Sequence, residues 1–274
     1  MSRPMPRLIA LDIDGTLLET GKPVPEVTKT AVAKVRAAGH HVVLATGRSL
    51  VGVLPVAHSL GLNDAWVVAS NGALTAYLSK NDPGGYRVHE ARTFDVDPVA
   101  HLARTRMPHV KIAVELVGWG WSVNQKFDPG HLNGQQQVVA RLDELWATPA
   151  TRMVLCAPGI GALLEPLRQL GVTPSAAGLG WVDVTPRGLS KASALEAVRD
   201  RLDVPPERTV AIGDSWNDVE MLRWSAYPIA MGQAPTSIKA LAKHVTGPIK
   251  HHGAATALDA LRDADARQPT AVRA

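Results

Sequence analysis

The chain has 274 residues, of which 46% are hydrophobic and 20% are charged, and its net charge is +4. This composition is typical of a globular protein with a substantial core, and it excludes a disordered chain. No apolar run approaches the roughly 20 residues that a membrane-spanning helix requires, and the basic residues are scattered. We therefore expect neither a membrane nor a nucleic acid among the partners of this protein.

The first part of the chain alternates between short apolar runs and segments in which apolar residues recur every three or four positions. The first pattern predicts buried strands, and the second predicts helices. In chain order we predict strand 8–13, helix 25–38, strand 42–45, helix 50–60 and strand 66–69. Strands separated by helices favour right-handed βαβ units and hence a parallel sheet.

The middle of the chain has a different pattern. Segments 73–78 and 86–91 predict a hairpin around the turn-forming residues 81–85. We then predict helix 97–106, strands 111–116 and 119–124, helix 135–146, strand 152–156, helix 160–170, and strands 172–175 and 181–185. We interpret this part as an inserted α/β module of roughly 100 residues, an ordinary size for a small domain.

From residue 189 onward, strands and helices alternate again. The predicted elements are helix 191–202, strand 209–212, helix 218–224, strand 227–230 and helix 254–261, followed by a frayed tail over 263–274. The predicted fold class is α/β, with a doubly wound, Rossmann-like parallel sheet that is completed after the insertion. We expect a discontinuous core domain of residues 1–83 and 187–274 and an inserted α/β cap domain of residues 84–186.

Cys156 is the one cysteine of the chain, so an internal disulfide is excluded and a reduced, cytoplasmic setting is expected. It lies in an apolar predicted strand, and we expect an inert core thiol. The apolar stretch near the start of the chain is broken by Asp12 and Asp14, which is not the pattern of a secretory signal.

Four polar stretches follow predicted strands or begin predicted helices of the core. Ligands of open α/β sheets bind outside the carboxyl ends of the strands, so these stretches are expected to converge. In the first, Asp12 and Asp14 end an apolar strand and Gly15 allows a sharp turn. The two carboxylates repel each other there, and a bound cation such as Mg²⁺ would remove that cost. The alternative is a pair of solvated turn acids.

The second and third stretches point to an anionic ligand. Thr46, Gly47 and Arg48 offer a hydroxyl and backbone N–H groups at a helix start, which suits a phosphate group. The alternative is that Thr46 only caps the helix. Lys191 begins a helix, where the helix dipole disfavours a positive charge, so an anionic partner would explain its position. The alternative is that Lys191 is an ordinary surface lysine.

The fourth stretch follows the strand 209–212. Asp214, Asn217 and Asp218 provide three potential oxygen ligands within five residues. An Asp at a helix start often serves only as a cap, but three such residues at the end of one strand favour a ligand site.

Together, the four stretches resemble the motifs of the haloacid dehalogenase superfamily of phosphatases. The resemblance rests on DIDGTLL, ATGR, the lone Lys191 at a helix start and GDSWND, in that order. The segments SNGA, which contains Asn71, and TPRGLSKA resemble the Cof-type subfamily more closely. In that subfamily a large α/β cap is inserted between the second and third motifs, in the interval where the inserted module lies here.

This resemblance implies a magnesium-dependent phosphatase that hydrolyses a small phosphorylated metabolite, such as a sugar phosphate. Asp12 is implied as the nucleophile that forms an aspartyl-phosphate, and Asp14 as the general acid and base. The implied Mg²⁺ ligands are Asp12, the backbone carbonyl of Asp14, Asp214 and, in or near the coordination shell, Asp218. The implied phosphate-binding residues are Thr46, Gly47, Arg48, Asn71, Lys191 and Asn217.

Three other functions are alternatives to this one. A signalling receiver domain shares acidic residues and a lysine around magnesium, but it lacks an acid/base two residues after its phosphorylated Asp and has no large insertion. A catalytically silent binding module would require a missing motif residue, and none is missing. A phosphomutase or phosphotransferase that acts on a sugar phosphate is the closer alternative.

Residues of the cap are expected to select the substrate. Trp119 and Trp121 lie two positions apart on a predicted strand and so face one side, where they could stack on a sugar ring or base. Filling of the cap core is the favoured alternative for both. The cap is also expected to open and close about its glycine- and proline-containing junctions, near 81–85 and 186–188.

Further candidate ligands lie outside the four stretches. Glu115, Arg152 and Arg187 could meet a second anionic group of the substrate, and the favoured alternative for each is a surface position. His251 and His252 do not form a metal site in our interpretation, because adjacent residues of a helix do not face each other.

Overall fold

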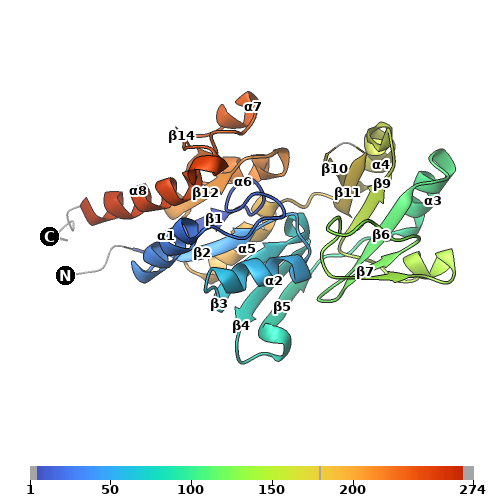
Figure 1. Ribbon diagram of the computed structural model, residues 1–274, viewed down its shortest axis with the longest axis horizontal. Helices are drawn as coiled ribbons and strands as arrows, with labels where there is room; N and C mark the ends of the chain where they lie inside the picture. Colours follow the sequence, from blue (N-terminus) through green and yellow to red (C-terminus); the bar gives the residue numbers. More distant parts are fainter. Residues whose placement is uncertain (1–4, 179, 268–274) are drawn as a thin grey trace.

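The computed structural model describes residues 5–178 and 180–267. Figure 1 shows two layered modules beside each other, each built on its own sheet. The larger sheet belongs to the core and has eight strands, in the spatial order β14 (His244–Val245), β13 (Tyr227–Ala230), β12 (Thr209–Gly213), β1 (Leu8–Leu11), β2 (His41–Ala45), β3 (Asp64–Ala69), β4 (Leu74–Ser79) and β5 (Tyr86–Ala91).

The strands from β14 to β3 are parallel, whereas β4 and β5 are added in antiparallel pairs. Helices cover both faces of the sheet. Helices α1 (Glu26–Ala37), α2 (Leu50–Ser59) and α8 (Gly253–Arg267) pack on one face, and α5 (Lys191–Arg201), α6 (Val219–Trp224) and α7 (Thr236–Lys239) on the other. Along β1, Ile9 and Leu11 join the first apolar cluster while Leu8 and Ala10 join the second. This alternation is typical of a strand that is buried on both faces.

The inserted module contains the second sheet, which has six strands. Their spatial order is β10 (Val172–Ala176), β11 (Trp181–Pro186), β9 (Met153–Cys156), β6 (Lys111–Leu116), β7 (Gly120–Val123) and β8 (Gln135–Val138). All pairs are antiparallel except β7 with β8. Helices α3 (Asp97–Arg106) and α4 (Leu164–Gln169) pack on one face of this sheet through an apolar cluster. The predicted α/β class, with a parallel core sheet and an inserted module, is confirmed.

One strand lies outside the module to which we assigned it. The predicted boundary at residue 84 places β5 in the inserted module, but β5 pairs with β4 and extends the core sheet. The chain crosses over only between Ala91, which pairs with Leu74, and Phe94, which bridges to Ala150. A predicted hairpin does not indicate which sheet it joins. The first junction between the core and the inserted module therefore lies at this later segment and not at 81–85. The division into two domains and their hinge motion remain proposals.

The predicted helix 135–146 is also wrong. This segment forms β8 and, after a break, the 3₁₀ helix η3 (Leu142–Trp146). The Gln136 side chain binds the backbone N–H and carbonyl of Phe127 in the segment after β7, and β8 itself pairs with β7. These tertiary contacts outweigh the local helical spacing.

Other boundaries differ in smaller ways. The predicted helix 160–170 consists of the 3₁₀ helix η4 (Ile160–Leu163) followed by α4, and the helix 218–224 is preceded by the 3₁₀ helix η6 (Trp216–Asp218). Short elements β14 and α7 were not predicted. Helix α8 continues to Arg267, so the tail is helical beyond residue 263, and residues 268–274 lie outside the described part. Among the described residues, no helix has the length and apolar character needed to cross a membrane.

Candidate active site

Lys191 joins two carboxylates in the centre of the core. Its side chain is fully buried at the first position of α5, and its Nζ donates to Asp12 Oδ1 and Asp218 Oδ1, each at 2.6 Å. Asp12 directly follows β1 and Asp218 ends η6, so three distant segments of the chain meet here. A buried ammonium group is tolerated only with such partners. The surface alternative for Lys191 is therefore wrong.

A third carboxylate completes an acidic cluster. Oxygens of Asp12, Asp214 and Asp218 lie within 4.8 Å of one another. Burial, and then the negative charge of Asp218, raises the pKa of Asp12 to about 8 and that of Asp214 to about 6. Asp214 Oδ1 is buried and accepts no hydrogen bond from the described residues. Carboxylates crowded in this way suit a hard divalent cation such as Mg²⁺.

Asp218 is engaged on both of its oxygens. Oδ1 accepts from Lys191, and Oδ2 accepts the backbone N–H groups of Asp214 and Ser215, each at 3.0 Å. Asp218 therefore holds Lys191 and the 214–215 turn in place, and its predicted role in or near a metal shell stays a prediction.

Gly15 and Gln233 bring the first motif against Asp214. Gly15 has a φ of +81°, and a Cβ at this position would overlap Asp214 Oδ2. Gln233 Nε2 donates to the carbonyl of Gly15 at 2.6 Å and to Asp214 Oδ2 at 3.2 Å. Gln233 was not predicted as a site residue, because it belongs to none of the four motifs and no local pattern marks it.

Asp14 lies apart from the acidic cluster and is held by Arg48. Arg48 Nε and Nη2 donate to the two carboxylate oxygens of Asp14, each at 2.7 Å, and Thr20 Oγ1 donates to Oδ1 at 3.1 Å. A two-point contact of this kind sets the orientation of a carboxyl group. The guanidinium group of Arg48 thus binds Asp14, and its predicted role as a phosphate ligand stays a prediction.

Thr46, Gly47, Asn71 and Asn217 lie close together next to Lys191. Asn217 Nδ2 donates to Asn71 Oδ1 at 3.1 Å, and a Cβ at Gly47 would lie 3.1 Å from the same oxygen. Thr46 is buried, and its Oγ1 accepts from the backbone N–H of Arg48. Helix α2 has its N-cap at Ser49, so Thr46 does not cap it. The predicted residues thus form one polar pocket.

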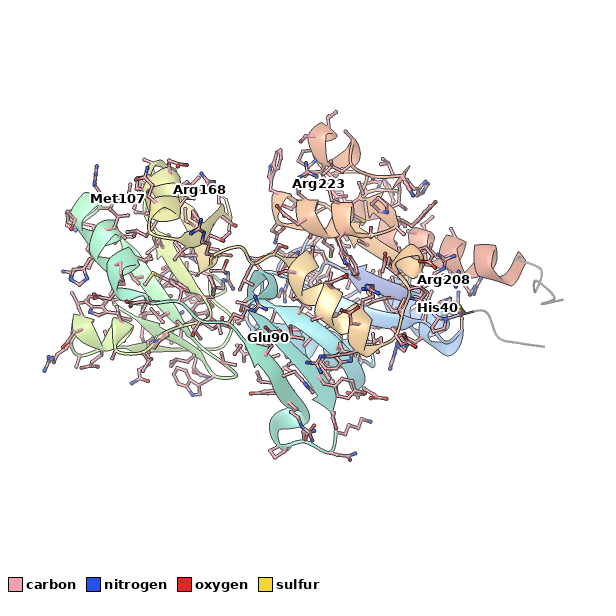
Figure 2. All side chains as sticks on the ribbon, turned by 180° about the vertical axis from the view of Figure 1, so that it is seen from behind. His40, Glu90, Met107, Arg168, Arg208 and Arg223 are labelled. Carbon is pink, nitrogen blue, oxygen red and sulfur yellow. The ribbon has the colours of Figure 1, made fainter. Side chains whose placement is uncertain are left out.

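A cavity of about 590 Å³ opens from this pocket between the core and the inserted module. Asn71, Lys191 and Asn217 line it from the core, while Asp183 and Arg168 line it from the inserted module; Figure 2 labels Arg168 on α4. Small-molecule sites typically measure roughly 300–1,000 Å³. The cavity is therefore large enough for a metabolite next to the pocket.

Trp216 also lines this cavity, and its side chain is 63% exposed. It lies inside the fourth motif, but no role was predicted for it.

The two tryptophans with a predicted role, Trp119 and Trp121, are placed differently. Trp121 is 1% exposed and donates from Nε1 to the carbonyl of Asn133, so it fills the core of the module as the alternative expected. Trp119, 44% exposed, precedes β7 in a turn, so the two do not share one strand face.

Of the three charged residues for which a surface position was favoured, two do not lie at the surface. Glu115 and Arg152 are buried, and only Arg187 is exposed. Arg152 Nη2 lies 2.8 Å from both carboxylate oxygens of Asp183, and its guanidinium lies over the Trp121 ring. The surface interpretation failed because a partner such as Asp183, on another strand, cannot be read from local sequence.

Two further expectations concern side chains outside the site. His251 and His252 are exposed and join no metal-ligand cluster in the described part of the chain. Cys156 ends β9 and is only half-buried, although burial raises the pKa of its thiol. The expected core position of Cys156 is thus correct only in part.

Comparison with known proteins identifies relatives along almost the whole chain. The chain is 27% identical over 260 residues to the 5-amino-6-(5-phospho-D-ribitylamino)uracil phosphatase YitU of Bacillus subtilis, covering 91% of this chain and 95% of that protein. It is 26% identical over 269 residues to the pyridoxal phosphate phosphatase YbhA of Escherichia coli, covering 88% and 93%. The expected enzyme class, a phosphoric monoester hydrolase, agrees with these relatives.

The fold has solved counterparts as well. A haloacid dehalogenase-like hydrolase from Bacteroides thetaiotaomicron superposes with a TM-score of 0.79 at 21% identity, covering 94% of this chain and all of that one. The family model of haloacid dehalogenase-like hydrolases matches residues 9–111 and 163–258, which include all four motifs. The unmatched interval lies within the inserted module. The resemblance drawn from the motifs is confirmed, and the chain belongs to the haloacid dehalogenase-like hydrolase family.

Proposed function

We propose that this protein is a magnesium-dependent phosphatase that hydrolyses a small phosphorylated metabolite through an aspartyl-phosphate on Asp12. The observation that carries the proposal is the placement of the Asp12 carboxylate, which receives a hydrogen bond from the fully buried Lys191 next to Asp214. A nucleophilic carboxylate and an anionic phosphate repel each other, so positive charge between them is required.

The acidic cluster supports the metal part of the proposal. Mg²⁺ bound by Asp12, Asp214 and the backbone carbonyl of Asp14 would neutralise charge on the nucleophile and on the phosphoryl group. Burial raises the pKa of Asp12 to about 8 even though Lys191 acts to lower it, so a bound cation would help to keep this carboxylate ionised at neutral pH.

Asp12 then attacks the phosphorus atom, and the bond from phosphorus to the leaving oxygen breaks. Asp14 gives its proton to that oxygen, and afterwards takes a proton from the water that cleaves the aspartyl-phosphate and releases inorganic phosphate. Arg48 and Thr20 orient Asp14 for both steps. Lys191, Thr46, Gly47, Asn71 and Asn217 bind the phosphoryl oxygens.

The proposed substrate is a phosphomonoester whose organic part lies in the 590 Å³ cavity. Sugar phosphates and related metabolites fit this description, and the two named relatives act on phosphorylated compounds that carry a planar ring. The proposed setting is the cytoplasm, on the ground of the single cysteine.

The test is release of inorganic phosphate from a panel of phosphorylated metabolites, first with Mg²⁺ and then with EDTA. We expect Mg²⁺-dependent release from some members, and loss of about 10⁴-fold in rate for Asp12→Asn, equal to about 5.5 kcal/mol of barrier. Unchanged turnover in that folded variant would refute the mechanism. Release that requires a bisphosphate activator would instead identify the phosphomutase.

A further inference from the structure

The loop Ser70–Gly72, between β3 and β4, has an unusual backbone. Ser70 and Asn71 have φ values of +49° and +54°, and Gly72 follows with +99°. Residues with a Cβ adopt this left-handed region at an energetic cost, and two of them in succession need support from their surroundings.

This loop contacts three of the four motifs. The backbone N–H of Ser70 donates to the carbonyl of Arg48 at 2.8 Å, and that of Asn71 donates to the carbonyl of Thr46 at 3.0 Å. A Cβ at Gly72 would overlap the carbonyl oxygen of Ser190, the residue before Lys191. The Asn71 side chain meets Asn217 in the fourth motif. The conformation of the loop therefore sets how these motifs lie relative to one another.

The inserted module reaches this loop through Glu115 on β6. Glu115 is buried, and its Oε2 accepts from Ser70 Oγ at 2.7 Å and from Thr151 Oγ1 at 2.8 Å. Thr151 belongs to the inserted module. The bond from Ser70 therefore links the core with the inserted module, whereas the bond from Thr151 lies within the inserted module. The Ser70–Glu115 bond therefore ties a buried side chain of the inserted module to the core, and the backbone N–H of Gly188 makes a second link to Thr173 Oγ1 at 3.1 Å.

We infer that Glu115 is a positioning residue, through which docking of the inserted module holds Ser70–Gly72 in its strained conformation and so completes the phosphate pocket. Only the effect that we expect on the reaction rate rests on the proposed function. When the module docks, the Glu115 carboxylate binds Ser70. The loop then keeps Asn71 against Asn217 and keeps the carbonyl groups of Thr46 and Arg48 in place. Departure of the module removes this support, so the pocket is complete only when the cavity is closed.

The first test is amide hydrogen exchange, which needs no activity. We expect Glu115→Ala to accelerate exchange of the Ser70 and Asn71 amides about tenfold, the effect of losing one buried hydrogen bond. Thr151→Val is the matched control, since it removes the other hydroxyl bound to Glu115, whose hydrogen bond lies within the inserted module. Equal acceleration in both variants, or in neither, would overturn the inference.

The second test separates positioning from simple support of the fold. Ser70→Gly removes the hydroxyl but suits a positive φ, so Tm is expected to stay the same or rise. We expect kcat to fall about tenfold with little change in KM, and the double variant with Glu115→Ala to be no slower than the single variants. Wild-type kcat in Ser70→Gly, or losses that multiply, would overturn the inference. A wild-type protein without phosphatase activity would refute the proposed function, and hydrogen exchange would still decide the role of Glu115.

Discussion

Arg48 and Asp14, 34 positions apart in the chain, share two hydrogen bonds of 2.7 Å between the guanidinium group and the carboxylate. Asp14 is the proposed acid and base, so its orientation toward the leaving oxygen depends on Arg48. We therefore expect Arg48 to act on proton transfer, and its role as a phosphate ligand stays a separate prediction.

Arg48→Lys is expected to slow hydrolysis most for substrates whose leaving group must be protonated. A lysine cannot make the two-point contact, so the loss in kcat is about tenfold to a hundredfold for an alkyl phosphate. With p-nitrophenyl phosphate, whose leaving group needs no proton, the loss is small. Thr20→Ala serves as a milder control that removes the other donor to Asp14. Equal losses for both substrates would restore the phosphate-binding role of Arg48.

Stability without metal is expected to fall as the pH rises. Burial raises the pKa of Asp12 to about 8 and that of Asp214 to about 6, above their ordinary value of 3.8. Between about pH 4 and pH 8 these two carboxyl groups thus bind more protons in the folded protein than in the unfolded chain, so their contribution to the free energy of unfolding decreases with pH. Added Mg²⁺ should raise Tm, and by more at high pH, because the cation competes with protons for these carboxylates.

Thermal unfolding in EDTA and in Mg²⁺ at several pH values between 5.5 and 8.5 measures this effect. Asp214→Asn provides the control, since it removes one of the two raised groups and should reduce both the pH dependence and the response to Mg²⁺. A Tm that is equally sensitive to Mg²⁺ in this variant would place the ion elsewhere.

Gly15→Ala is expected to abolish the metal response. A Cβ at Gly15 would overlap Asp214 Oδ2, whereas a Cβ at Gly21, which has the same φ of +81°, meets no atom within 4 Å. Both substitutions carry the cost of a left-handed alanine, about 1 kcal/mol. Only Gly15→Ala also displaces Asp214, so it should lose phosphatase activity and the Mg²⁺-induced rise in Tm. Similar behaviour of the two variants would mean that backbone strain alone matters.

Trp216→Ala is expected to weaken binding of substrates that carry a planar ring. The side chain is 63% exposed beside the cavity. If a planar ring stacks on it, the loss of this contact should raise KM about tenfold. Pyridoxal phosphate and glycerol phosphate are suitable probes with and without a ring, and Trp216→Phe should retain most of the preference. Trp119→Ala, an exposed tryptophan that does not line this cavity, should leave both KM values unchanged. An equal change for both probes in Trp216→Ala would exclude stacking.

Much of the core could be predicted from the sequence. Apolar runs located β1, β2 and β12, and Asp12 and Asp214, which follow β1 and β12, do converge. Local sequence suffices here because a strand buried on both faces must be apolar and because ligand groups of this fold follow such strands.

The sequence by itself determined the α/β class, the four motifs and the side of the sheet on which they meet. Only the tertiary structure decided that Arg48 binds Asp14, that β5 extends the core sheet, and that segment 135–146 forms a strand and a 3₁₀ helix. It also decided that Glu115 is buried against Ser70. The reason is physical, since periodicity and propensity report on neighbours within a few residues. The partner of a charge or the edge of a sheet is selected by groups that are distant in sequence and adjacent only after folding.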